Sequence, residues 1–290
     1  MIVLTVCNHK GGTGKTTSVI HLAAALGLSG FRTLAVDLDP QCFLTHMLGL
    51  EEPPESRSSS VLFDGQAALR DVPTERASNF DVIPSSRALT RHMRRLNKPT
   101  DVYWARESLQ SGADYDVVIF DTAAAVTVYS LNAVVASTAV LIPVTPEYQP
   151  VVGAEQTVGS VEIVRERLNP DLQSPLFLFT QVDFRKNSHR FYRQYMRDKY
   201  GSAVMRTIIR TSTALALSHT DGTTAFEHDP HSRGARDYAN ATDELLRRLG
   251  VDAPASNRNG HVDGEQDQSA STAFGRNVDT VPGSVRQVGT

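Results

Sequence analysis

Short apolar runs recur along the chain and alternate with longer segments of helical periodicity. Five runs have the β-branched and aromatic composition of buried strands, at residues 2–7, 31–37, 116–121, 139–145 and 175–183. Weaker strand signals lie at 80–84 and 204–209. Because the connections are long enough for crossover helices, the pattern predicts an α/β fold, a doubly wound, mostly parallel sheet with helices on both faces.

This alternation stops near residue 250. The segment 251–290 holds a single aromatic residue, Phe274, among scattered Gly, Ser, Asn and Pro. Such a segment buries too little apolar area to offset its ordering entropy. We therefore expect one domain over residues 1–250 and a disordered C-terminal tail over 251–290. Inside the domain, EEPPESRSSS at 51–60 is expected to be a surface loop.

Composition and charge exclude some classes of protein. No apolar run approaches the roughly 20 residues of a membrane helix, and residues 1–7 lack a basic leader and a cleavage site, so we expect a cytoplasmic protein. The spacing of Cys7 and Cys42 does not suggest a metal site, and buried reduced thiols are expected. A formal net charge of -3 argues against a globally basic nucleic-acid binder but allows a local basic patch.

Residues 8–17, NHKGGTGKTT, have the composition of a phosphate-binding loop between the first strand and a helix expected from about Thr16. Glycines let the backbone approach phosphate, and successive N–H groups with a helix N-terminus would surround the anion. Lys15 would neutralise the β- and γ-phosphates, and the Thr16 hydroxyl would ligate Mg²⁺. A chance glycine-rich turn is disfavoured by the position after a strand. The nucleotide-binding candidates are Lys10, Gly11, Gly12, Thr13, Gly14, Lys15, Thr16 and Thr17.

Hydrolysis also requires a carboxylate on the Mg²⁺ side and a group that orients water. Asp121 ends the run 116–121, so its carboxylate is expected at the C-terminal edge of the sheet, where it would hold Mg²⁺ through water. Asp37 and Asp39 follow the second strand at the same edge. Either one could instead cap the next helix. We expect capping for Asp37 and orientation of the attacking water for Asp39.

The combination of KGGTGKTT, VDLDPQ, a strand ending in Asp121-Thr122, and PVTPEY resembles the ParA-type partition ATPases of the deviant Walker A class, which includes MinD. The resemblance covers residues 1–250, including EHDPHSRGARDYANATDELL. It implies an ATP- and Mg²⁺-dependent homodimer in which Lys10 reaches the partner's phosphates, with Lys10, Lys15 and Asp39 as catalytic residues. A cation supplied across an interface stabilises charge only when the dimer closes. By the same likeness, the segments after Asp39 and Asp121 are switch regions.

The chain departs from this family pattern in three places. His9 stands where the usual phosphate loop has glycine, and marks a subclass. Relatives usually follow the aspartate that matches Asp121 with Thr-Pro-Pro, whereas here Asp121-Thr122 is followed by Ala123, Ala124 and Ala125. Losing two prolines frees φ, so we expect a looser switch that affects hydrolysis more than binding. IIR, ending at Arg210, replaces Ile-Pro-Arg near the adenine site. Candidate adenine contacts are Thr180 and Asp183 in TQVD.

Two segments concentrate positive charge. In RALTRHMRRLNK the cations Arg87, Arg91, Arg94, Arg95 and Lys98 fall on one helical face. In RKNSHRFYRQYMRDKY a second basic face forms, while Phe191, Tyr192 and Tyr195 turn away to dock on the sheet. Each face is either an ordinary solvated surface or a nucleic-acid surface.

The second segment favours DNA, because from Arg185 to Arg210 there are eight Lys or Arg and one acid, Asp198. Such a patch binds phosphates without reading sequence and is strongly salt-sensitive. The family resemblance independently implies nonspecific DNA binding by the ATP-bound dimer. The DNA-binding candidates are Arg185, Lys186, Arg190, Arg193, Arg197 and Arg210.

The leading hypothesis is a nucleoid-associated DNA-segregation ATPase released from nonspecific DNA when a ParB-like centromere-binding partner stimulates hydrolysis. One alternative is a nucleotide-gated interaction module with negligible hydrolysis, motivated by the DTAAA segment. Another is a MinD-like positioning ATPase, but no basic amphipathic helix follows Val251, and no membrane contact is expected. An electron carrier like nitrogenase reductase would need cluster-binding thiolates that Cys7 and Cys42 do not provide.

Overall fold

The computed structural model describes residues 1–63, 68–92, 98–110, 112, 114–252 and 254. These residues belong to one compact unit, Met1–Ser256. Nearly all of the predicted tail, 251–290, lies outside the described residues, so both the tail and the domain boundary stay predictions.

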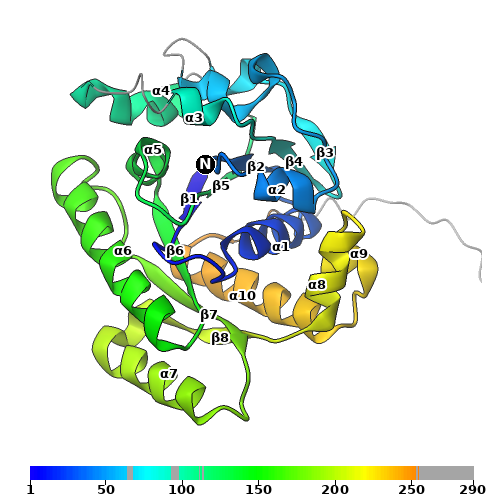
Figure 1. The fold of residues 1–290 in the computed structure, drawn as a ribbon, viewed down its shortest axis with the longest axis vertical. Helices are drawn as coiled ribbons and strands as arrows, with labels where there is room; N and C mark the ends of the chain where they lie inside the picture. Colours follow the sequence, from blue (N-terminus) through cyan, green and yellow to red (C-terminus); the bar gives the residue numbers. More distant parts are fainter. Residues whose placement is uncertain (64–67, 93–97, 111, 113, 253, 255–290) are drawn as a thin grey trace, which may run out of the picture. The chain divides into compact units, whose positions relative to one another are not determined.

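A central sheet runs in the order β3-β4-β2-β5-β1-β6-β7-β8 (Figure 1). Neighbours pair in parallel except β3 and β4, which pair antiparallel at one edge. This confirms the predicted fold, and the seven expected strands all form. The short polar β3 was not predicted. The strands are β1 Ile2–Val6, β2 Thr33–Asp37, β3 Glu75–Ala77, β4 Phe80–Ile83, β5 Val117–Asp121, β6 Ala139–Val144, β7 Leu176–Val182 and β8 Val204–Arg210.

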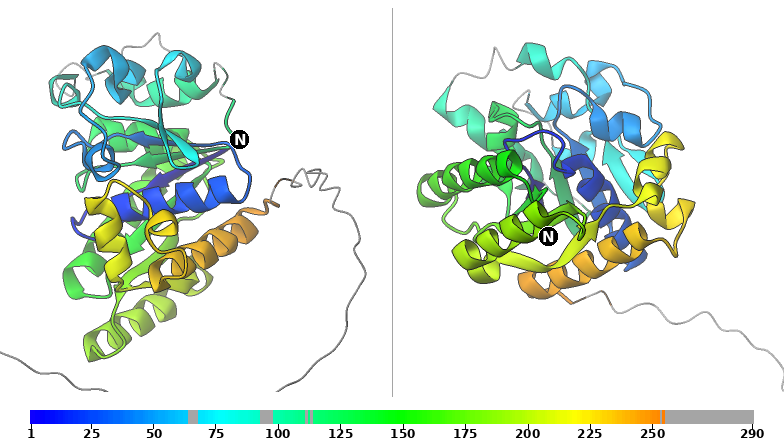
Figure 2. Two further views of the ribbon diagram at one scale, coloured as in Figure 1. Left: turned by 90° about the vertical axis from the view of Figure 1, so that its right-hand side faces the viewer. Right: turned by 60° about the horizontal axis from the view of Figure 1, so that its bottom comes forward.

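Helices cover both faces of the sheet, as the two further views confirm (Figure 2). The face with α1 also carries α8, α9 and α10, whereas α4 to α7 lie on the other. The α-helices are α1 Lys15–Leu28, α2 Phe43–Met47, α3 Leu89–His92, α4 Trp104–Gln110, α5 Val128–Ala136, α6 Tyr148–Arg167, α7 Asn187–Tyr200, α8 Thr213–Thr220, α9 Ala225–His228 and α10 Arg233–Leu249; short 3₁₀ turns are η1 Glu55–Arg57, η2 Ser59–Phe63, η3 Leu69–Asp71, η4 Pro99–Tyr103 and η5 Gly201–Ala203.

The central strands are buried on both faces. Every residue of β5 and β6 is buried, which explains why these strands read as continuous apolar runs and not as alternating ones. One core cluster joins α1 and α10 to the sheet, and two others lie under α4 to α7. Among the described residues, no helix has both the length and the apolar character needed to cross a membrane.

Two local expectations were wrong. The last three residues of the predicted loop 51–60 are buried, because the Ser59 hydroxyl donates to the Asp37 carbonyl and the Ser59 N–H donates to the Pro84 carbonyl. In α7, Phe191 and Tyr195 are 63% and 38% exposed. The helix docks instead through two other side chains, His189 and Met196, which are both buried, together with the half-buried Tyr192.

The connections place two loops at the same edge of the sheet. From β1 the chain passes through α1 to β2, and from β5 it passes through α5 to β6 on the other side of β1. Neighbouring strands whose connections diverge in this way leave a crevice at their C-terminal ends, where α/β proteins bind ligands. The loops after β1 and β5 both open there.

Candidate functional site

The loop between β1 and α1 has the backbone of an anion site. Gly12 and Gly14 adopt φ values of 74° and 81°, in the left-handed region that favours glycine. Within the described residues, the N–H groups of Gly11, Gly12, Thr13 and Gly14 donate no hydrogen bond. Because α1 begins at Lys15, these free donors adjoin a helix N-terminus. The arrangement fits a phosphate group.

Neighbouring elements hold this loop in place. The Thr180 hydroxyl and the Gln181 amide, at the end of β7, donate to the carbonyls of Thr13 and Gly12, at 2.8 and 2.7 Å. Asn8 donates through Nδ2 to the carbonyl of a β6 residue, Pro143, at 2.8 Å. Hydrogen bonds with β6 and β7 therefore hold the loop in place, in addition to the bonds within its own turns.

Helix α6 also reaches the loop. The His9 N–H donates to Thr157 Oγ1 at 3.0 Å. One turn earlier, Gly153 lies so close that an added Cβ would stand 2.9 Å from Asn8 Oδ1 and 2.9 Å from Lys10 Cβ. Sequence reasoning missed Gly153, Thr157 and Gln181, since nothing in their local sequence signals a partner more than a hundred residues away.

The two loop lysines have different surroundings. Lys15 is buried, and its Nζ donates to the carbonyl of Lys10 at 3.3 Å. Burial lowers the pKa of Lys15, while the carboxylates of Asp121 and Asp39 oppose this shift. The Lys10 side chain is half-buried and makes no hydrogen bond within the described part of the chain. It lines a cavity of about 640 Å³ together with Gly11 and Gly12.

Asp121 ends β5 next to the loop. Its side chain is buried, and neither carboxylate oxygen has a hydrogen-bond partner among the described residues, although the Thr16 hydroxyl is near enough to lower its pKa. Burial, followed by repulsion from Asp37, raises the pKa well above its ordinary value. An orphaned buried carboxylate beside a threonine hydroxyl offers the oxygen ligands that Mg²⁺ prefers. These residues fit the expected metal.

Asp37 and Asp39 lie at the same sheet edge with different partners. Asp37 accepts from the amide and hydroxyl of Thr45, at 3.0 and 2.7 Å, so it binds the first turn of α2, as expected. Burial raises the pKa of Asp37 to about 7 despite these bonds. Asp39 accepts from the Gln41 amide through Oδ1 at 2.9 Å. Its other oxygen makes no hydrogen bond to a described residue, so it is available to a ligand or water.

The two adenine candidates line different cavities. Thr180 lines a cavity of about 330 Å³ that adjoins Gly14 and Thr17. Asp183 does not line it, but lines the neighbouring cavity of about 640 Å³ beside Lys10. The Asp183 carboxylate also binds the Arg185 guanidinium at 2.7 Å, which holds its pKa far below the usual range. Thr180 therefore lies beside the cavity at Gly14 and Thr17, and Asp183 beside the cavity at Lys10, and both stay candidate adenine contacts.

The loop after Asp121 contrasts with the loop after β1. The Thr122 hydroxyl donates to the Val6 carbonyl at 3.0 Å. Beyond it, the amides of residues 123–126 make no hydrogen bond within the described residues, and Val126 is 61% exposed. Regular structure resumes when Thr127 and Ser130 form a capping box at the start of α5.

The first predicted basic face is only partly described. Arg87 pairs with Glu52 and Arg91 with Glu55. Arg94 and Arg95 lie outside the described residues, and Lys98 is exposed. The ion pairs neutralise both described arginines at the start of this face.

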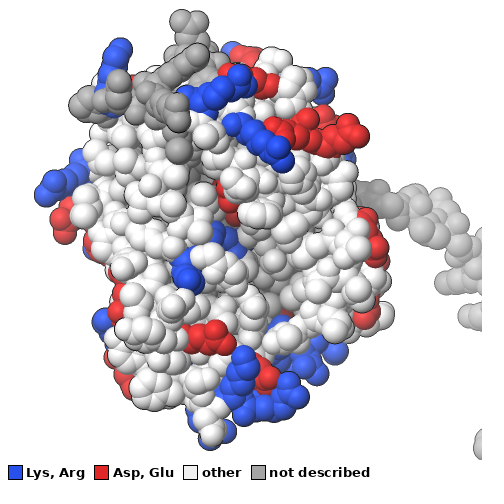
Figure 3. All heavy atoms as spheres, viewed as in Figure 1, with Lys and Arg blue, Asp and Glu red and all other residues white. Residues whose placement is uncertain are grey.

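The second basic segment divides into paired and unpaired cations. Four candidates have internal partners: Arg185 binds Asp183, Lys186 binds Glu147, Arg210 binds Asp237, and Arg193 stacks over the Phe184 ring. The side chains of Arg190 and Arg197 are exposed and have no hydrogen-bond or ion-pair partner in the described part of the chain. Figure 3 shows Lys and Arg gathered at the lower end of the face in view, where α7, β8 and α10 lie. The exposed arginines of β8 and α10 outside the predicted set are Arg206, Arg233, Arg236 and Arg247.

The parallel sheet, the glycine loop at the end of β1 and the buried aspartate at the end of β5 define a P-loop NTPase fold. An AAA-domain family model matches residues 1–174. The chain is 31% identical over 252 residues to the sporulation initiation inhibitor protein Soj of Bacillus subtilis, covering 84% of this chain and 97% of that protein. It is 30% identical over 264 residues to the chromosome partitioning protein ParA of Myxococcus xanthus, covering 88% and 90%. This chain therefore belongs to the ParA-type P-loop ATPases.

A solved structure supports the same class. The Mycobacterium smegmatis protein described as cobyrinic acid a,c-diamide synthase, with bound ADP and magnesium, superposes with a TM-score of 0.73 at 29% identity, covering 86% of this chain and 96% of that one. The sequence-based assignment to the ParA family is thus confirmed.

Proposed function

We propose that this chain is an ATP-dependent DNA-segregation ATPase of the cytoplasm that associates with the nucleoid. In this proposal ATP and Mg²⁺ bind at the β1–α1 loop, two chains close face to face, and the dimer binds DNA nonspecifically. A ParB-like partner then stimulates hydrolysis and release. The observation that carries the proposal is the set of free loop N–H groups beside the orphaned carboxylate of Asp121.

Nucleotide binding follows from the residues of the loop. The free N–H groups of residues 11–14 would donate hydrogen bonds to the phosphate oxygens, and Lys15 would contribute its charge from a buried position. Thr16 and Asp121 would hold Mg²⁺, which supplies positive charge that neutralises the phosphate oxygens. The cavity beside Gly14, Thr17 and Thr180 would take the base.

Lys10 is the residue expected to make hydrolysis depend on the dimer. Its side chain makes no hydrogen bond to any residue that the structure describes and lines the open cavity beside the loop, so it is free to reach a second chain. Lys10→Ala is expected to abolish partner-stimulated phosphate release while ATP binding by the isolated chain stays within about threefold. Loss of ATP binding in this variant would instead place Lys10 in its own chain's site.

Asp39 has the free carboxylate oxygen that a water-orienting group needs. Asp39→Ala is expected to trap an ATP-bound dimer, because the site still binds nucleotide but no longer positions water. Size-exclusion chromatography with ATP measures the dimer, and a phosphate-release assay measures turnover. Ordinary turnover in Asp39→Ala would remove this residue from the mechanism.

DNA binding is proposed for the surface around Arg190 and Arg197. Cations without internal partners bind phosphates at the lowest cost, whereas paired ones such as Arg210 must first release a carboxylate. Affinity for random duplex DNA should rise on addition of ATP at moderate salt. Arg190→Ala with Arg197→Ala should reduce the salt slope of binding by about 2, and Arg167→Ala, an exposed arginine at the end of α6, serves as the control.

The main alternative is a nucleotide-gated interaction module with negligible hydrolysis. It is favoured by the partly exposed loop of residues 123–126, whose amides donate no hydrogen bond within the described residues and which lacks the prolines expected from the family pattern. A turnover assay with DNA and the candidate partner discriminates the two. Phosphate release that stays at the intrinsic rate would favour the module, and stimulated release favours the ATPase.

A further inference from the structure

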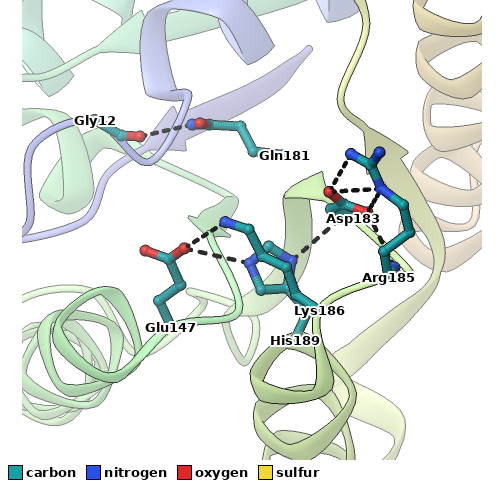
Figure 4. A network of polar contacts seen from close by, with 7 residues as sticks. All are labelled: Gly12, Glu147, Gln181, Asp183, Arg185, Lys186 and His189. Atoms are coloured by element: carbon teal, nitrogen blue, oxygen red, sulfur yellow. Dashed lines mark hydrogen bonds and ion pairs between the residues drawn. The ribbon is translucent and has the colours of Figure 1, made fainter.

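The end of β7 carries two consecutive side chains that bind the phosphate loop, and the second has an unusual backbone. Thr180 Oγ1 donates to the Thr13 carbonyl. Gln181 Nε2 donates to the Gly12 carbonyl (Figure 4). Gln181 has a φ of 53°, a left-handed conformation that non-glycine residues rarely adopt. Strain of this kind persists where surrounding contacts fix the backbone, and it concentrates at ligand clamps and switch regions.

These two bonds determine which way the loop amides point. The peptide bonds are trans, so a carbonyl and the next N–H point in opposite directions. Holding the carbonyls of Gly12 and Thr13 toward β7 therefore turns the N–H groups of Thr13 and Gly14 away from it. Both N–H groups lack an acceptor within the described residues. Gln181 thus helps to preset the donors that a phosphate would use.

The same turn also fixes α7. The Asp183 N–H donates to His189 Nδ1 at 3.1 Å, so the other ring nitrogen, Nε2, carries the proton and donates to Glu147 Oε1 at 3.3 Å. Lys186 Nζ binds the same Glu147 oxygen at 3.3 Å. Figure 4 shows these side chains converging between the start of α7 and the start of α6. The segment from Gln181 to His189 therefore connects the phosphate loop to α7.

We propose that Gln181 is a positioning residue that couples occupancy of the phosphate loop to the stability of α7 and its exposed basic side chains, Arg190 and Arg197. The inference rests on the nucleotide and DNA binding proposed above. A phosphate oxygen that accepts a hydrogen bond from the Thr13 N–H polarises the Gly12–Thr13 peptide. The Gly12 carbonyl then becomes a better acceptor for the Gln181 amide. The more firmly held turn then orders α7.

The position of Gln181 suits this role. It lines the cavity of about 330 Å³ beside Gly14 and Thr17 and also the cavity of about 640 Å³ beside Lys10 and Gly11. Ligands on either side of the loop therefore meet the same side chain. By linkage the coupling is reciprocal, so an anion bound to α7 must raise nucleotide affinity by the same factor by which nucleotide raises DNA affinity.

The experiment measures both affinities in the full chain. Binding of a fluorescent, slowly hydrolysed ATP analogue with Mg²⁺ is titrated with and without random duplex DNA, and DNA binding is titrated with and without saturating analogue. The first ratio compares the affinity for the analogue with and without DNA, and the second compares the affinity for DNA with and without the analogue. For the wild type the two ratios should be equal and about tenfold, within the usual range of coupling between sites. Unequal ratios would contradict a coupling carried by one binding equilibrium.

Three substitutions separate the role of the Gln181 amide from that of its backbone. Gln181→Glu keeps the length but replaces the donor by an acceptor, so both ratios should fall to within twofold of one. Gln181→Asn tolerates the left-handed backbone but is too short to reach Gly12, and it should show the same loss. Gln181→Arg retains a long donor and should restore at least half of the wild-type ratio.

The matched control is Gln173→Glu, which adds the same charge at an exposed position before β7. Its ratios should equal those of the wild type. Undiminished ratios in Gln181→Glu and Gln181→Asn, or an equal loss in Gln173→Glu, would overturn the proposal. Thermal unfolding within a few degrees of the wild type confirms that each variant is folded.

A further readout distinguishes this proposal from the proposed function. If ATP leaves the DNA affinity of the wild type unchanged, the DNA-segregation function fails, but nucleotide should still slow hydrogen exchange in the first turn of α7. This protection should be present in the wild type and absent in Gln181→Asn. Equal protection in both proteins, or none in the wild type, contradicts the coupling.

Discussion

Two loops leave adjacent strands at the same edge of the sheet, yet they are held very differently. The loop after β1 is bound from β6, β7 and α6 by Pro143, Thr157, Thr180 and Gln181. The loop after β5 is bound to the sheet through Thr122, which donates to the Val6 carbonyl, and Ser130 of α5 adds a longer bond of 3.4 Å to the Ala125 carbonyl. The amides of its residues 123–126 make no hydrogen bond within the described residues. One loop is preformed and the other is free to reorganise.

The difference suits the loop after β1 to binding phosphate and the loop after β5 to switching. A preformed loop binds phosphate without first losing conformational entropy, whereas a free loop can respond to what is bound. The three alanines after Thr122 extend this contrast, since proline would restrict φ at these positions. The four predictions below test this contrast and the anchoring of α1, which follows the preformed loop, beginning with the largest expected effect.

Gly153→Ala should disrupt the preformed loop. The new Cβ would stand 2.9 Å from Asn8 Oδ1 and Lys10 Cβ, so the loop must shift, at a cost of about 1–3 kcal/mol. We expect at least a tenfold loss of ATP affinity, measured by titration with a fluorescent analogue. Gly159→Ala, in the same helix with no atom within 4 Å of the added Cβ, is the matched control. Equal affinities in the two variants would show that α6 does not position the loop.

His21 should make the anchoring of α1 depend on pH. Its Nδ1 donates to the Thr17 carbonyl and its Nε2 accepts from the Ala225 amide, so the folded state needs the neutral ring. Burial lowers the pKa of His21 from 6.5 to about 3. The unfolded chain therefore binds the extra proton first as pH falls below 6.5. The free energy of unfolding should therefore be about 2 kcal/mol lower at pH 5 than at pH 7.

Urea unfolding at pH 7 and pH 5 measures this effect. His21→Gln removes the titrating ring, so its loss of stability between the two pH values should be about 2 kcal/mol smaller than that of the wild type. The neighbouring His219, whose pKa burial lowers to about 4, titrates in both proteins and cancels in the comparison. Identical pH dependence in the two proteins would exclude His21 as the source.

Thr122→Val tests the hydrogen bond that joins the freer loop to β1. The substitution keeps the shape of the side chain and removes its hydrogen bond to the Val6 carbonyl, so the free energy of unfolding should fall by about 1 kcal/mol. ATP affinity should change less than in Gly153→Ala, because the phosphate loop keeps its own anchors. A larger loss of ATP affinity than in Gly153→Ala would reverse the roles assigned to the two loops.

Ala123→Pro together with Ala124→Pro should have the smallest effect on stability. Neither amide makes a hydrogen bond within the described residues, so proline removes no bond, and a compatible backbone gains about 0.4–1 kcal/mol. Partner-stimulated phosphate release should change by more than ATP affinity does. Unchanged release would show that the alanines do not alter switching.

The sequence was sufficient to predict the features that local patterns encode. Seven strands, the glycine loop and Asp121 at the end of β5 all follow from apolar periodicity and residue spacing. It missed the short polar β3, the burial of Ser59 and the docking of α7 through His189 and Met196. These depend on tertiary packing, which local propensity does not contain.

Contacts between distant segments account for the remaining differences at the site. Thr180 was proposed for its position at a strand end, but its hydrogen bond to Thr13 spans 167 residues of sequence. Gln181 and Gly153 carry no local motif. Some cations of the basic segment are paired because Asp183, Glu147 and Asp237 lie next to them in the fold. These three carboxylates lie outside α7, so the projection of that helix does not show the pairing.

Hydrogen exchange across both loops tests the central claim most directly, which is that nucleotide orders the loop after β5 while the loop after β1 is already formed. In the free protein the amides of His9 and Lys10 should be protected by their bonds to Thr157 and Asn8, whereas residues 123–126 should exchange at the rate of an unstructured peptide. Adding Mg²⁺ and a slowly hydrolysed ATP analogue should protect residues 123–126 by at least tenfold and leave His9 and Lys10 nearly unchanged. Protection that appears only at His9 and Lys10, with residues 123–126 still exchanging freely, would contradict the account.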